Sequence, residues 1–197
     1  MTILSTIKTS CRSLALASPF ILASTQALAH TGPMAHHHSS FASGLTHPIT
    51  GLDHLLMLVG FGIFLKLTQG SKQQMQWAGA GLLSLVAGLM AGQAFGGFSG
   101  VELMISASLF VVATGIWFAF SSKKAVTKAV SVMSVMSLFF HGYAHGIEAQ
   151  GDIFGFGLGM LVAAAGLIAL GRLLGRFVAT PWVGAGVAAS AFAIVAS

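Results

Sequence analysis

The sequence predicts an all-α membrane protein with about six transmembrane helices that follow a cleaved N-terminal signal peptide. Of its 197 residues, 55% are hydrophobic and only 7% are charged, and from residue 48 onward apolar stretches of spanning length alternate with short polar breaks. Because a soluble domain carries about a quarter charged residues, this composition argues against a soluble enzyme and a disordered chain. The net charge of +5 is thinly spread, so no nucleic acid is expected as a partner. The lipid bilayer is the expected solvent.

Residues 1–29 have the pattern of a secretory signal. Lys8 and Arg12 supply a positive start, and a short apolar run follows over residues 14–22. The small residues Ala27 and Ala29 then precede a cleavage position. Cleavage after Ala29 removes Cys11, which is the chain's single cysteine, so neither a disulfide nor a cysteine zinc site is expected. An uncleaved signal anchor would instead add one membrane helix, but the run is short for a span.

A polar, histidine-containing segment is expected next, at residues 30–46, on the periplasmic side. It holds four histidines that offer metal capture: His30, His36, His37 and His38. A solvated linker whose histidines do little explains the segment equally well.

Residues 47–197 are predicted to form the six-helix permease domain. The expected spans are roughly 48–65, 77–95, 101–120, 125–147, 153–171 and 180–196, each near the ~20 residues that cross a bilayer. Every basic residue of the mature chain falls between spans or at their ends, all on one side: Lys66, Lys72, Lys123, Lys124, Lys128, Arg172 and Arg176. The positive-inside rule places that side in the cytoplasm. We therefore expect a multi-pass protein of the bacterial inner membrane with both mature termini in the periplasm. Gly88 and Gly92 are spaced for close helix packing.

The first polar cluster opens the first span and holds His47, Asp53 and His54. The two histidines are seven residues apart, near two helical turns, and Pro48 suits a first helical position. Asp53 could bind metal itself or orient an imidazole. The alternative is that Thr50 and Asp53 form a capping box, with His47 in a loop. Capping alone does not explain two histidines.

The second cluster closes the fourth span. His141 and His145 are four residues apart and Glu148 follows three residues later, so that all three are expected on one helix face. Two imidazoles and a carboxylate at this spacing commonly hold a divalent transition metal. Ionisable groups within a span are costly and usually face a partner or a polar cavity. A structurally satisfied buried histidine is the alternative for either imidazole.

Both clusters lie toward the same membrane face, so contact between the first and fourth spans would bring them together as one metal site. Glu102 opens the third span and could attract cations. Asp152 lies just beyond Glu148, and simple solvation in an outer loop explains it best.

These motifs resemble the HupE/UreJ family of membrane proteins. The resemblance lies in His47-x5-Asp53-His54 and in Phe140-His141-Gly-x-Ala-His145-Gly-x-Glu148, and it covers nearly the whole mature chain. It implies a nickel or cobalt permease associated with nickel enzymes such as hydrogenase and urease, with the matching His, Asp and Glu residues as metal contacts.

The leading hypothesis is therefore uptake of Ni²⁺, or Co²⁺, into the cytoplasm, with the ion as cargo and no prosthetic group. The alternative from another class is a membrane-embedded zinc hydrolase, with Glu148 or Asp53 as base. A metal sensor or accessory subunit is a third interpretation. Ligand chemistry alone does not separate Ni²⁺ from Co²⁺, Zn²⁺ or Cu²⁺. The sequence leaves energy coupling and oligomeric state open.

Overall fold

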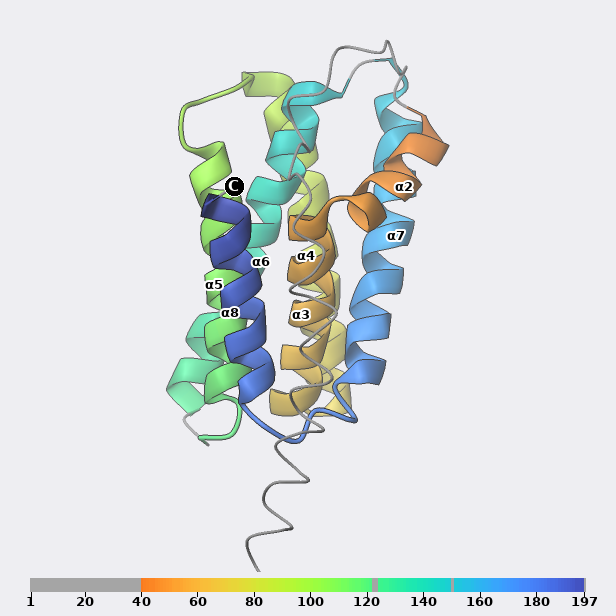
Figure 1. Cartoon of the computed structure of the whole chain (residues 1–197). Helices are drawn as coiled ribbons and strands as arrows, with labels where there is room; N and C mark the ends of the chain where they lie inside the picture. The colour runs from red at the N-terminus through yellow and green to blue at the C-terminus, as the bar shows by residue number, and fades with distance from the viewer. Residues whose placement is uncertain (1–39, 122–123, 150, 197) are drawn as a thin grey trace, which may run out of the picture.

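A computed structural model describes residues 40–121, 124–149 and 151–196. These residues form a bundle of α-helices (Figure 1). The helices are α2 (Phe41–Thr50), α3 (Leu52–Thr68), α4 (Ser71–Phe95), α5 (Val101–Phe118), α6 (Lys124–Glu148), α7 (Ile153–Leu174) and α8 (Trp182–Ala196). The predicted signal peptide lies outside the described residues.

The described helices support fewer membrane spans than the six expected. Four of them, α4, α5, α6 and α7, are long and apolar enough to cross a bilayer, and the bent pair α2 and α3 makes a fifth if it counts as one span. The last expected span, 180–196, is represented by α8, which has only 15 residues. At 1.5 Å per residue such a helix is shorter than a hydrocarbon core of about 30 Å.

The first expected span, 48–65, is broken rather than continuous. The chain turns by 79° between α2 and α3, and Gly51 at the break is extended, with φ −76° and ψ 113°. The expectation that Pro48 opens the helix is wrong, because Ser40 caps α2 eight residues earlier through a reciprocal hydrogen-bonding pair with Ser43. The capping box considered for Thr50 and Asp53 is also absent, since the N-cap of α3 is Gly51 and no side chain caps this helix.

Close backbone contact joins α4 to α6. A Cβ atom added at Gly88 would collide with the carbonyl oxygen of Phe139, and one at Gly142 would collide with that of Leu85. Gly88 therefore packs as its spacing predicted. In the same way α2 and α3 pack against α7, and α5 lies against both α6 and α8 (Figure 1). Small residues allow such approach where apolar burial against lipid offers little driving force.

The two ends of the bundle differ in charge. The end that holds Lys66 of α3, Lys128 of α6 and Arg172 of α7 is called the basic end below. At this end Arg172 Nε donates to Oε1 of Gln74 in α4 at 3.0 Å, and Gly175, just after α7, packs on Lys66 of α3. The opposite end of α3 and α6 holds the histidines and is called the histidine end.

Candidate metal centre

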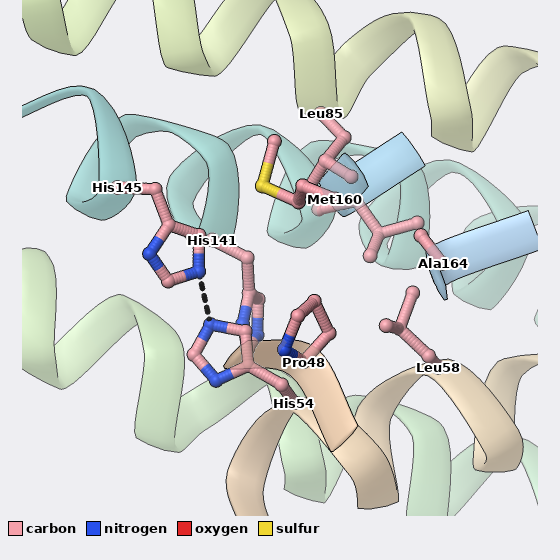
Figure 2. A pocket seen from close by; sticks show the side chains of 9 residues that line it. Pro48, His54, Leu58, Leu85, His141, His145, Met160 and Ala164 are labelled. Atoms are coloured by element: carbon pink, nitrogen blue, oxygen red, sulfur yellow. Dashed lines mark hydrogen bonds between the residues drawn. The ribbon is translucent and has the colours of Figure 1, made fainter. Parts of the chain in front are cut away.

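Two histidines from different helices face each other at the histidine end. Nε2 of His54, in the first turn of α3, lies 2.8 Å from Nε2 of His145, in the last turn of α6 (Figure 2). Both side chains are almost fully buried, at 2% and 1% exposure. The two sequence clusters therefore meet although 91 residues separate the two histidines along the chain.

Asp53 fixes the orientation of the His54 ring. Its Oδ1 lies 2.9 Å from Nδ1 of His54. An ionised carboxylate only accepts hydrogen bonds, so Nδ1 donates and Nε2 of His54 presents its lone pair toward His145. Gly51 permits this arrangement, because a Cβ there would lie 3.0 Å from Nδ1 of His54 and 3.1 Å from Oδ1 of Asp53.

His47 and His141 complete the histidine cluster, which we define as His47, Asp53, His54, His141 and His145. Ligand atoms of His47, His54 and His145 all lie within 4.8 Å of one another, and so do those of Asp53, His54 and His141. The ring centres of His47 and His145 are 4.4 Å apart, and those of His54 and His141 are 4.7 Å apart. His54 belongs to both groups and so stands at their centre.

A small cavity adjoins the cluster. Figure 2 shows His54, His141 and His145 on one side of it, with Leu58, Met160 and Ala164 around the rest. Its remaining walls are apolar side chains. A buried polar set of this kind makes strong interactions in a low-dielectric surrounding.

The spacing of the imidazoles fits a divalent transition ion. Ligand nitrogens at about 2.0–2.1 Å from one ion lie about 2.8–3.0 Å from each other at adjacent octahedral positions and about 3.3–3.4 Å apart in tetrahedral geometry. The separation of His54 and His145, 2.8 Å, matches adjacent octahedral positions and needs only a small opening for tetrahedral ones. Imidazole and carboxylate together suit nickel, cobalt, zinc and copper.

Not every predicted site residue joins the cluster. Glu148 is exposed and lies outside both groups, one turn beyond His145 on α6. Glu102 is exposed in the first turn of α5. Asp152 caps α7 by accepting a hydrogen bond from the Gly155 N–H at 2.9 Å. The histidines of the segment 30–46 that were candidates for metal capture, His30, His36, His37 and His38, lie outside the described residues.

Two neighbours of the cluster were not singled out from sequence. Ser108 of α5 lies with its Oγ 2.9 Å from Nε2 of His141 and is itself buried. Met160 of α7 lines the cavity. A serine in an apolar helix is a weak signal, because such residues often bond only to their own helix, as Ser108 also does to the carbonyl of Ile105.

Comparisons with known proteins agree with the motifs. A family model described as HupE / UreJ protein matches residues 18–196. A relative named Protein HupE, from Rhizobium leguminosarum bv. viciae, is 34% identical over 162 residues, which cover 80% of this chain and 77% of the relative. No solved structure matches the chain.

Proposed function

The chain belongs to the HupE/UreJ family of multi-pass membrane transporters, which is associated with nickel uptake for hydrogenase and urease, and from this premise we propose that it carries Ni²⁺, or Co²⁺, into the cytoplasm. The histidine cluster is proposed as the place where the ion first loses part of its hydration shell. Its metal ligands would be His47, Asp53, His54, His141 and His145, with Glu148 nearer the entrance.

The observation that carries this proposal is the contact between His54 and His145 across α3 and α6. Both helices belong to the bundle of apolar helices, where an ionisable side chain is costly unless it serves a partner. A transport site must also release what it binds. Imidazole and carboxylate ligands with an incomplete shell fit that need better than a closed cysteine cage, which binds zinc permanently.

The charge difference between the two ends supports the inward direction. The positive-inside rule assigns the basic end to the cytoplasm, so the histidine end would face the periplasm, as would both mature termini. On this orientation Glu148 and Glu102, both exposed, lie on the side from which the ion arrives. Their charge would raise the local concentration of cations.

Family membership favours this reading over the zinc hydrolase considered from sequence, because the family consists of transporters. Either function could use the ligands of the cluster. Release of a hydrolysis product would distinguish a hydrolase from a permease. A hydrolase would retain zinc tightly and release a lipid or peptide fragment, whereas a permease moves the ion unchanged.

The test is accumulation of radiolabelled Ni²⁺ in cells that produce the full chain, compared with cells carrying an empty vector. We expect saturable uptake that is lost in His145→Ala and retained in Met136→Ala, a matched control on the exposed face of α6. Membrane abundance of the three proteins is measured in parallel.

Competition with unlabelled Co²⁺, Zn²⁺ and Cu²⁺ then ranks the ions. Uptake no greater than that of the vector, at normal abundance of the protein, would contradict the proposed function. Equal uptake by wild type and His145→Ala would support transport but contradict a role for the histidine cluster in it.

A further inference from the structure

The histidines of α6 begin a longer stripe of buried residues. Counting from His145 toward the basic end, steps of four and three residues reach His141, Leu138, Ser134, Ser131 and Thr127. Residues at this spacing lie on one helix face. All are buried except Thr127, which is half-buried. One face of α6 therefore carries imidazoles at one end and hydroxyl groups at the other, with one leucine between them.

The hydroxyl end of the stripe touches the far end of α3. Nε2 of Gln69, which ends α3, donates to Oγ of Ser131 at 3.3 Å. The two helices thus make a polar contact at each end, His54 with His145 and Gln69 with Ser131. Fifteen residues of α3 separate the contacts, or about 22 Å along a helix. That distance covers much of a hydrocarbon core.

Ser134 is the residue that ordinary packing does not explain. Its exposure is 0%, and its Oγ has no hydrogen-bond partner among the residues that the structure describes. Ser131, one turn away on the same helix, donates to the carbonyl of Thr127 at 2.9 Å. The same local bond is open in principle to any helical serine. A buried hydroxyl group that lacks a partner in a folded protein calls for an explanation, and a ligand that binds to it would be one.

We propose that Ser134 and Ser131 form a second, weaker, oxygen-lined position for the ion on its way from the histidine cluster to the basic end. The inference rests on the proposed function and adds the inner half of the route. Hydroxyl oxygens would replace single waters of a partly hydrated divalent cation without carrying charge. Weaker binding at each successive position lets an ion leave toward the cytoplasm.

Leu138 separates the two positions. It is 1% exposed and lies between the histidines and Ser134 on the stripe. Its side chain occupies the room left by Gly81 of α4, where a Cβ would lie 2.7 Å from Leu138 Cδ1 and 3.2 Å from Phe61. An apolar constriction of this kind blocks a hydrated ion until the surrounding side chains move.

The exit lies beside a connected polar group at the basic end. Nε2 of Gln74 donates to the carbonyl of Gln69 at 2.7 Å, and Arg172 donates to the side chain of Gln74. Gln74 is almost fully buried, with 4% exposure. The side chains described along the inner half of the route are thus neutral until Arg172, which disfavours a resting cation at the mouth.

The decisive comparison is Ser134→Ala against Ser84→Ala in cells that take up radiolabelled Ni²⁺. Ser84 is the matched control, because its Oγ donates to the carbonyl of Val135 on α6 at 2.7 Å. Ser84→Ala breaks a hydrogen bond and should lower thermal stability. Ser134→Ala breaks none and should leave stability equal or higher.

We expect the maximal uptake rate of Ser134→Ala to fall about threefold to tenfold, because the lost oxygen contact to the ion is worth about as much as one hydrogen bond. The Ni²⁺ concentration for half-maximal uptake should stay unchanged, because the histidine cluster sets it. Ser84→Ala should transport normally. If wild type takes up Ni²⁺ and Ser134→Ala does so at the same rate, the proposed second ion position is wrong, while the proposed function is unaffected. Absence of uptake by the wild type would overturn the proposed function and this inference together.

A second variant measures access to the position directly. In Ser134→Cys, a small cationic methanethiosulfonate reagent should modify the new thiol, and Ni²⁺ should slow the modification. Wild type, whose single cysteine lies in the predicted signal peptide, gives the background, and Ser84→Cys is the control that Ni²⁺ should not protect. A thiol at residue 134 that never reacts, or one that Ni²⁺ does not protect, would contradict the proposal.

Discussion

The two ends of the α3–α6 pair make the same kind of interhelical contact with opposite chemistry. At the histidine end two imidazole nitrogens meet at 2.8 Å, and an aspartate orients one of them. At the basic end an amide of Gln69 meets the hydroxyl of Ser131 at 3.3 Å. The first contact offers strong ligands for a transition metal and the second offers weak ones. The difference agrees with the proposal that one end binds the ion and the other releases it.

Packing of α4 on α6 is close along the face that they share. Near the histidine end, a Cβ at Gly88 or Gly92 of α4 would collide with carbonyl oxygens of α6. Nearer the basic end, a Cβ at Gly81 would lie 2.7 Å from Leu138 of α6, whereas one at Gly79 would meet nothing within 4 Å. The helix that carries His141 and His145 is therefore held closely where the ion is proposed to bind.

The largest effect is expected from His54→Ala, because His54 belongs to both candidate ligand groups. Nickel affinity should fall more than about 100-fold, since even residues that only orient a ligand account for 10–100-fold. Isothermal titration of Ni²⁺ into the purified protein measures it. A matching loss in Gln69→Ala, at the basic end, would contradict the division between the two ends.

Asp53→Asn tests whether the carboxylate acts through His54. The side chain keeps its shape but loses its charge, so His54 would no longer be held in one tautomer. We expect nickel affinity to fall about 10–100-fold with thermal stability little changed. Binding titrations measure the nickel affinity, and a melting curve on the same sample measures the thermal stability. An affinity within twofold of wild type would rule out the orienting role of Asp53.

Gly88→Ala tests the close contact between α4 and α6. Adding a methyl group against the carbonyl of Phe139 should destabilise the protein by about 1–3 kcal/mol. Gly79→Ala on the same helix should be neutral or stabilising by about 0.5–1 kcal/mol, because Gly costs helix entropy and this site is open. Thermal unfolding in detergent compares the two. Equal destabilisation of both would show that contact with α6 is not the cause.

The smallest effect is expected from Glu148→Gln, since this exposed side chain lies outside both ligand groups. Loss of its charge should raise the Ni²⁺ concentration for half-maximal uptake about two- to fivefold at low ionic strength. The difference should shrink at high salt, which screens exposed charges. A salt-independent loss of more than about tenfold would instead indicate direct coordination of the ion.

The sequence allowed much of the site to be predicted, because its main residues are costly in an apolar helix. Histidines at positions 141 and 145 stand out against their neighbours, and their spacing on one helix is a local property. The proximity of His54 to His145 is not local, and it was predicted only through the shared membrane face. The sequence does not single out Ser108 and Ser134, because a hydroxyl group in a hydrophobic helix has no distinctive pattern.

The fold was predicted less well where the backbone departs from regular structure. Residues 48–65 are apolar enough to suggest one helix, and nothing in composition marks the 79° turn at Gly51. The turn depends on a glycine that leaves room for Asp53 and His54. Similarly, residues 180–196 suggested a span, whereas the helix there covers only Trp182–Ala196.

The glycine contacts also have a mechanical consequence. Backbone touches backbone between α4 and α6 and again between α3 and α7, where a Cβ at Gly62 would collide with the carbonyl of Ile168. Neither pair therefore has room for a larger residue at these glycines. The contact of His54 with His145 joins α3 of one closely packed pair to α6 of the other. An ion bound by both imidazoles would link the two pairs where they meet.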